Sequence, residues 1–353
     1  MASLLERKLI VVTGKGGTGK TTVACALGLL GARRGLRTIV VELGDQHRLP
    51  GLFAGEQGHS GGSGQDFAQA DQASPDAGVE VELEPNLWST SIDPDRALLE
   101  WLHSFAGRIS ARLLASSSTF HYFAAAAPGA KELVSMIKVR ELCVGPRRDR
   151  GKTSEQQRRD PHGQSGYDLV VLDAPATGHA LAMLCSPQTF SSIVRVGPLA
   201  EHAQEVSSLL GDRARCAYVA VAQGTEMAVT ETLELEEGLR RGLDRDLDAV
   251  LVNCVLPRRF TREEMARIDE LAPDFVGDAV PGSAVAGVVE RAVRAARTTY
   301  ERTRLQQSQI ARLRRQRFAD GRPPSVITIP FMFTPNLDLA AVREISAGLE
   351  RRL

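Results

Sequence analysis

A glycine-rich segment near the start of the chain carries the residue types best suited to binding phosphate. Residues 14–21 read GKGGTGKT and fit the pattern G-x-x-x-x-G-K-[ST] of a nucleotide-binding loop. Glycines let successive backbone N–H groups point into one concavity, and the positive end of a following helix also attracts anions. Lys20 is predicted to reach the β- and γ-phosphates, and the Thr21 hydroxyl to bind Mg²⁺. The other residues predicted to contact the nucleotide are Gly14, Gly16, Gly17, Thr18, Gly19 and Thr22.

The segments on both sides of this loop are the ones that the motif requires. Residues 8–13 (KLIVVT) are short and apolar, which predicts a buried strand. Residues 21–32 are rich in alanine and leucine, which predicts a helix. A strand, a glycine-rich loop and a helix in this order distinguish a phosphate-binding loop from a chance glycine turn before a helix.

The rest of the chain alternates apolar runs with helical patterns. Near-continuous apolar runs are typical of strands in a parallel sheet that is covered on both faces. These runs are residues 37–43, 167–172, 216–222, 247–252 and 326–329. Helices are predicted at residues 228–241, 262–271 and 337–349. We therefore predict an α/β fold with a doubly wound, mostly parallel sheet, whose ligand crevice lies at the carboxyl ends of the strands.

A second candidate for nucleotide chemistry follows one of these apolar runs. Residues 168–179 read DLVVLDAPATGH, and Asp173 directly follows the predicted strand. A carboxylate there is expected beside Mg²⁺, directly or through water, where it orients the Thr21 hydroxyl. Residues 174–179 would then pass near the γ-phosphate and sense its presence. A helix cap is the alternative role of Asp173, and a helix-start histidine is an equally good interpretation of His179.

The plain loop pattern does not require Lys15, and this lysine connects the chain to a known group of proteins. With it, GKGGTGKT resembles the deviant Walker A loop of the ATPases that include the arsenical pump ATPase, the tail-anchored-protein targeting ATPase, the nitrogenase iron protein and the partitioning ATPases. The resemblance implies a P-loop NTPase of the deviant Walker A type. It also implies a homodimer in which Lys15 reaches across the interface to the partner's nucleotide. A solvated loop lysine is the alternative interpretation.

Further segments are similar to the arsenical-pump and tail-anchor-targeting branch of that group. The string at residues 168–179 resembles the switch II motif of this branch. The resemblance implies that Asn253, in a VNxxxP pattern, hydrogen-bonds adenine, and that Pro330 and Phe331 border the base. An ordinary strand-end asparagine is the alternative for Asn253. Other segments similar to the branch are residues 86–94, 128–133, 231–233 and 252–257.

The segment after the second predicted strand departs from this branch. The branch has a switch I that reads T-D-P-A-H-S, in which the aspartate positions the attacking water, whereas residues 43–48 here read LGDQHR. If His47 is aligned with the histidine of this motif, Gly44 takes the position of the catalytic aspartate. A shift by one residue brings Asp45 to the phosphate, and Glu42 is the other nearby acid. We predict Asp45 as the water-positioning residue, so the departure bears on turnover rather than on nucleotide binding.

The net charge and the hydropathy pattern of the chain indicate which partners and which cellular location to expect. The 353 residues include 43 basic and 43 acidic side chains, so the formal net charge of zero gives no reason to expect nucleic acid as a partner. No apolar run approaches the roughly 20 residues of a membrane span. The first residues do not have the form of a signal peptide. We therefore expect a cytoplasmic protein without a transmembrane segment.

The chain has five cysteines that are far apart in sequence and form no C-x-x-C pair. An odd number in a cytosolic chain predicts reduced thiols. Most of them lie in apolar patterns, which favours burial in the core. A metalloid site built from three converging thiols is the alternative. The cysteines are Cys25, Cys143, Cys185, Cys216 and Cys254.

We expect residues 1–353 to form a single ATPase domain that carries an inserted helical subdomain. Residues 95–145 and 284–320 are helical in pattern and interrupt the alternation of strands and helices. The second of these segments is rich in arginine, which indicates a solvated helix face; binding to nucleic acid or acidic lipid is the alternative. Residues 55–78 and 146–166 are polar and turn-rich, which predicts flexible insertions.

Taken together, these expectations describe a switch ATPase that depends on ATP and Mg²⁺. ATP binding would close the homodimer and move the helical subdomain, and hydrolysis would reopen it. Three functions compete for the coupled step: handling of a hydrophobic protein segment or membrane-protein partner, energy supply for anion or metalloid export, and regulation or scaffolding with little turnover. An exposed apolar groove would favour the first, three converging thiols the second, and a switch I without a carboxylate near the γ-phosphate the third.

Overall fold

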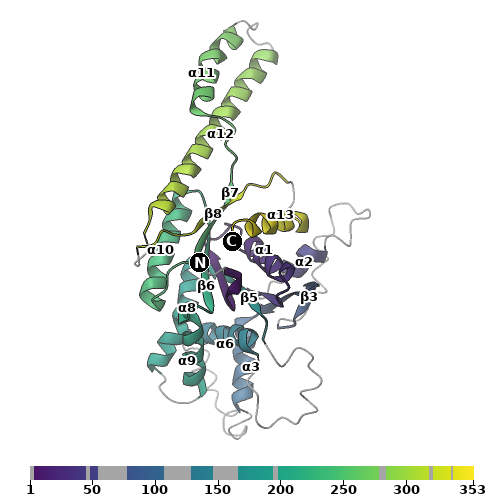
Figure 1. The fold of residues 1–353 in the computed structure, drawn as a ribbon, viewed down its shortest axis with the longest axis vertical. Coiled ribbons are helices and arrows are strands. Elements are labelled where there is room, and N and C mark those ends of the chain that lie inside the picture. Colours follow the sequence, from purple (N-terminus) through teal and green to yellow (C-terminus); the bar gives the residue numbers. More distant parts are fainter. Residues whose placement is uncertain are drawn as a thin grey trace.

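The computed structural model describes residues 4–44, 48–54, 78–106, 129–145, 166–193, 198–277, 284–317, 321–334 and 337–353. Within them, one eight-stranded sheet has the order β3-β4-β2-β5-β1-β6-β7-β8 (Figure 1). Every neighbouring pair is parallel except β3 and β4. The mostly parallel α/β fold is therefore confirmed. The strands are β1 (Leu9–Gly14), β2 (Thr38–Leu43), β3 (Val81–Glu84), β4 (Leu87–Ile92), β5 (Leu169–Ala176), β6 (Cys216–Gln223), β7 (Ala249–Val255) and β8 (Val326–Pro330).

Strand β1 lies between β5 and β6, near the middle of the sheet. All six of its residues are buried. Leu9 and Val11 point into one hydrophobic core, whereas Ile10 and Val12 point into the other. Burial on both faces explains the near-continuous apolar run that predicts this strand. Because β1 leads directly into the glycine-rich loop, the loop opens at the carboxyl edge of the sheet, where doubly wound sheets bind ligands.

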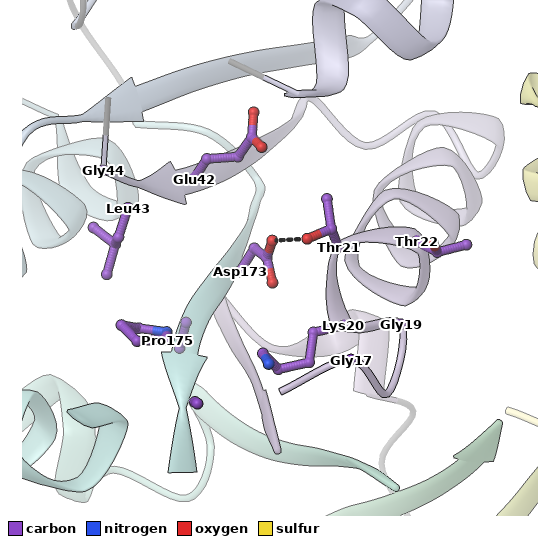
Figure 2. Close-up of a pocket in the computed structure, with 12 residues that line it drawn as sticks. Gly17, Gly19, Lys20, Thr21, Thr22, Glu42, Leu43, Gly44, Asp173 and Pro175 are labelled. Atoms are coloured by element: carbon purple, nitrogen blue, oxygen red, sulfur yellow. Dashed lines mark hydrogen bonds between the residues drawn. The ribbon is translucent and has the colours of Figure 1, made fainter. Parts of the chain in front are cut away.

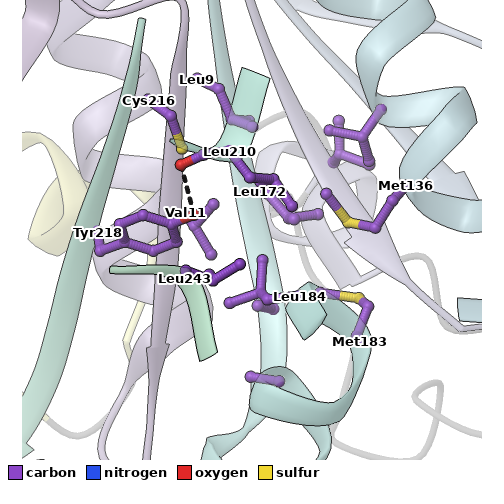
Figure 3. Close-up of a cluster of buried hydrophobic side chains, with 14 of the residues drawn as sticks. Leu9, Val11, Met136, Leu172, Met183, Leu184, Leu210, Cys216, Tyr218 and Leu243 are labelled. Carbon is purple, nitrogen blue, oxygen red and sulfur yellow. Dashed lines mark hydrogen bonds between the residues drawn. The ribbon is translucent and has the colours of Figure 1, made fainter. Parts of the chain in front are cut away.

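Helices cover both faces of the sheet and leave the strand ends open. On one face, α1 (Lys20–Arg33) packs against α13 (Leu339–Glu350), and the apolar residues of α2 (Arg48–Ala54) join the same core. Figure 3 shows part of the other core, where the Tyr218 hydroxyl donates to the Leu210 carbonyl at 3.0 Å. The helices on that face are α6 (Ala130–Val144), α8 (Thr177–Ile193), α9 (Pro198–Gly211) and α10 (Glu226–Leu243).

The described parts of the two predicted helical segments lie at different places in the fold, whereas residues 107–128 and 318–320 of these segments lie outside the described residues. Helix α3 (Pro94–Ala106) packs against α6, which in turn contacts α8 and α9. Helix α12 (Ala284–Arg315) pairs with α11 (Arg262–Gly277), and this hairpin extends away from the sheet, opposite to α3 in the view of Figure 1. Their grouping into one subdomain stays a prediction. No helix of the described residues has both the length and the apolar character needed to cross a membrane.

Two strands of the sheet lack the apolar run that predicts the others. Strands β3 and β4 are absent from the prediction because β4 carries Ser89, Thr90 and Ser91, all buried, and β3 alternates with glutamates. Strand β5 continues past its apolar run to Ala176, so Asp173 lies inside the strand rather than after it. Of the predicted flexible insertions, residues 55–77 and 146–165 lie outside the described residues.

Candidate nucleotide-binding site

The glycine-rich loop joins β1 to α1 and leaves the start of the helix open to a ligand. Gly19 is the N-cap residue of α1, so no capping side chain accepts from the first N–H groups. Its φ is 91°, and a Cβ at this position would collide with the Asn253 amide, so glycine is required here. The uncapped N–H groups and the helix dipole together favour an anion at this end of α1.

Hydrogen bonds within the loop and from a neighbouring strand hold its shape. Thr18, which is 2% exposed, donates its hydroxyl hydrogen to the Lys15 carbonyl at 2.9 Å. Lys20 Nζ donates to the same carbonyl at 3.1 Å. From β7, the Asn253 amide donates to the Thr18 carbonyl at 2.9 Å. These bonds keep the Lys20 ammonium within the loop that the motif predicts to hold phosphates.

The two nucleotide motifs meet at Thr21 and Asp173. The Thr21 hydroxyl donates to Asp173 Oδ2 at 2.5 Å, across 152 positions of sequence (Figure 2). Sheet register explains the contact, because Val12 near the end of β1 lies opposite Asp173 on β5. Hydroxyl and carboxylate oxygens are ligands that Mg²⁺ accepts, commonly as one or two carboxylates together with phosphates. The pair therefore fits a magnesium ion beside bound phosphates.

A cavity of about 620 Å³ opens at this pair. Its volume lies in the usual range for small-molecule sites. Three segments line it: Gly17 with residues 19–22, residues 42–44 at the end of β2, and residues 173–176 at the end of β5. The cavity thus brings together the phosphate loop, the segment at the switch I position and the start of the segment that resembles switch II.

Lys15 makes an ion pair with Glu231 of α10 in the same chain. The two side chains are 32% and 30% exposed, so the pair is only partly shielded from water. Glu231 belongs to the segment at residues 231–233 that resembles the branch. The predicted contact of Lys15 with a partner's nucleotide stays a prediction, and in the single chain its ammonium has an intramolecular partner.

The residues predicted to surround the base lie at the ends of β7 and β8. Asn253 is 8% exposed, and besides its bond to the loop its Oδ1 accepts the N–H of Cys254 at 2.9 Å. Pro330 ends β8, and the N–H of Phe331 donates to the Val255 carbonyl at 2.9 Å, which joins the two strand ends. Asn253 therefore contacts the phosphate loop itself, and Phe331 extends the same edge of the sheet.

The end of β2 brings an acid into the cavity. Glu42 is 5% exposed, lies opposite Asp173 in the sheet and accepts the N–H of Leu49 at 3.2 Å through Oε2. Gly44 also lines the cavity and has a φ of 123°. Asp45, the predicted water-positioning residue, lies outside the described residues. The sequence names Glu42 only as a nearby acid, because its place in the cavity depends on strand register.

Two further hydrogen bonds that support the loop region come from donors outside both motifs. The Gln223 amide at the end of β6 donates to the Gly17 carbonyl at 3.3 Å. The Thr13 hydroxyl donates to the Pro175 carbonyl at 3.0 Å, which ties the loop to the end of β5. Both contacts arise because β5 and β6 flank β1, so knowledge of the strand order is needed to find them.

The cysteines are free thiols, and three of them are buried. Burial is the main cause that raises the pKa of Cys25, Cys143 and Cys216 to about 12. Such thiols stay protonated near neutral pH and are poor metal ligands. The prediction that most cysteines are buried in the core is therefore confirmed.

Comparisons with known proteins agree with the motifs. A family model described as an anion-transporting ATPase matches residues 7–199, more than half of the chain. The ATPase BagA of Mycobacterium tuberculosis is 26% identical over 359 residues, which cover 98% of this chain and 93% of that protein. An ATPase ASNA1 homolog of Trypanosoma cruzi is 26% identical over a match that covers 78% of this chain and 86% of that protein. The ATPase GET3C of Arabidopsis thaliana is 24% identical over a match that covers 73% of this chain and 69% of that protein. The resemblance is confirmed, and the chain belongs to the anion-transporting ATPase family.

Proposed function

We propose that this protein binds ATP with Mg²⁺ in the cavity at the carboxyl edge of the sheet and hydrolyses it. The observation that carries the proposal is the 2.5 Å hydrogen bond between Thr21 and Asp173, which joins the phosphate loop to the acid of the second motif. Family membership supports ATPase activity, and the three relatives described above are all named ATPases.

Each part of the cavity has a role in this proposal. Loop N–H groups and the start of α1 hold the phosphates, while the Lys20 ammonium balances the charge of the β- and γ-phosphates. Thr21 and Asp173 would hold Mg²⁺, which when bound neutralises charge on the phosphate oxygens. We assign the base to the edge formed by Asn253, Pro330 and Phe331.

The proposal includes a homodimer. Lys15 would leave Glu231 and contact the partner's nucleotide, and this exchange costs little because a partly exposed ion pair contributes at most about 1 kcal/mol. Helix α10 carries Glu231 and contacts both α8 and α12. Release of Lys15 would therefore remove an ion pair from α10, a helix that contacts the predicted helical subdomain through α12. We infer that this subdomain moves with the nucleotide and handles a hydrophobic protein segment or membrane-protein partner.

Two other functions each have one observation in their favour. The family description supports energy supply for anion export, although the three buried thiols with raised pKa are unsuited to metalloid binding. A regulator with little turnover is favoured by Gly44, which takes the catalytic position when His47 is kept in register.

Replacing Lys20 with alanine tests the proposal. The change removes the cation that meets the phosphates, so we expect ATP affinity in the presence of Mg²⁺ to fall by about 100-fold or more, with hydrolysis at background. Isothermal titration calorimetry and a steady-state ATPase assay measure the two effects. Lys138→Ala is the matched control, because Lys138 lies on α6 and pairs with the exposed Glu100 at 3.4 Å. Wild-type affinity in the Lys20 variant would reject the assignment of the loop.

A further inference from the structure

Glu42 is an acid in the cavity wall that the proposed function leaves without a role. Its side chain is 5% exposed and lines the cavity together with Thr21 and Asp173 (Figure 2). Parallel pairing sets Glu42 directly opposite Asp173 on the neighbouring strand. Residues opposite each other in adjacent parallel strands point to the same face of the sheet. Two carboxylates from adjacent strands therefore flank the cavity on the side of α1.

Negative charge converges between α1 and the sheet. Glu42, Glu84 and Asp173 all lie close to Cys25 of α1, where, after burial, their charges help to raise the pKa of its thiol to about 12. Glu84 forms an ion pair with Arg343 at 2.7 Å. Charges in such a shielded region interact more strongly than in water. A divalent cation in the cavity would therefore be attracted by Glu42 and Asp173 together.

The two residues that follow Glu42 in the described part of β2 and its end, Leu43 and Gly44, also line the cavity but carry no charged side chain. The carboxylate of Glu42 also accepts the N–H of Leu49, the second residue of α2. This bond gives Glu42 a competing structural explanation, as a cap for a short helix, and a test must separate it from a role toward the metal.

We propose that Glu42 shares with Asp173 the task of holding Mg²⁺ and its water shell beside the phosphates. The inference rests on the proposed function, because Mg²⁺ enters this cavity with the nucleotide. Mg²⁺ keeps several waters and is commonly held by one or two carboxylates plus phosphate oxygens. A second carboxylate, acting directly or through water, fits that preference.

The variant Glu42→Gln separates the two roles. Glutamine keeps the size of the side chain, and its carbonyl oxygen still accepts the Leu49 N–H, so only the charge is lost. A fluorescent ATP analogue is titrated at a series of Mg²⁺ concentrations. We expect the Mg²⁺ concentration for half-maximal tightening of nucleotide binding to rise about 10- to 100-fold. Binding without metal should stay the same or tighten, because one negative charge near the phosphates has gone.

Glu84→Gln is the matched control, because Glu84 lies in the same charged region but does not line the cavity. Its Mg²⁺ dependence should match that of the wild-type protein. Wild-type Mg²⁺ dependence in Glu42→Gln overturns the inference, and a loss of thermal stability confined to Glu42→Ala then identifies Glu42 as a cap of α2. A wild-type protein that binds no ATP at all overturns the proposed function as well, so the two failures are distinguishable.

Discussion

Thr21 and Asp173 show how the site is specified at the scale of single residues. The phosphate-loop motif predicts the hydroxyl and the second motif predicts the carboxylate, and the structure joins them at 2.5 Å. Neither motif predicts Glu42 in the same cavity, because its place follows from the pairing of β2 with β5. The motifs therefore predict Thr21 and Asp173, whereas only the strand register places Glu42 in the cavity.

Replacing Asp45 with asparagine should separate hydrolysis from binding. A residue that orients water acts in the transition state, so we expect kcat to fall by about 100-fold or more while the dissociation constant for ATP stays unchanged. A steady-state ATPase assay and calorimetry measure the two quantities. Asp168→Asn is the control, since Asp168 is exposed and precedes the first residue of β5. Equally slow turnover in the wild-type protein and the Asp45 variant would point to the low-turnover regulator instead.

At the scale of elements, Arg245 ties the end of α9 to the start of β6. It is 2% exposed and donates to the carbonyls of Leu210 and Cys216, each at 2.8 Å. Its guanidinium also lies over the Tyr218 ring at 4.9 Å. We expect Arg245→Ala to lower the free energy of unfolding by about 3 kcal/mol, because two buried carbonyls lose a charged donor.

Urea denaturation measures this loss. Arg241→Ala is the matched control, because the Arg241 side chain is 72% exposed, and we expect it to change stability by less than about 0.5 kcal/mol. Equal stability of the two variants would show that Arg245 does not hold α9 to the sheet.

The sequence predicts the elements whose burial pattern is simple. Strands β1 and β6 are buried along nearly their whole length and read as apolar runs. Strand β4 is missed because Ser89, Thr90 and Ser91 are buried polar residues, which an apolar run cannot contain. The ion pair between Lys15 and α10 is also beyond sequence reasoning, because it depends on how that helix packs beside the loop.

At the scale of the whole molecule, the pair of Lys15 and Glu231 makes dimerisation testable. We expect Lys15→Ala to bind ATP nearly as well as the wild-type chain but to lose ATP-dependent dimerisation and turnover. Glu231→Gln should release Lys15 and lower the protein concentration needed for ATP-dependent dimerisation, by up to about 30-fold, because each of the two protomers contributes one partly exposed pair. Sedimentation velocity with and without ATP and Mg²⁺ measures both changes. A strictly monomeric protein that hydrolyses ATP at full rate would contradict the dimer.

The most direct measurement is a crystal structure of the protein with a non-hydrolysable ATP analogue and Mg²⁺. We predict that the phosphates lie in the loop at the start of α1, with Lys20 at the β- and γ-phosphates. We also predict Mg²⁺ next to Thr21 and Asp173, in the cavity that Glu42 lines. A nucleotide bound away from this loop, or a metal that none of these side chains approaches, would contradict the proposed ATP site.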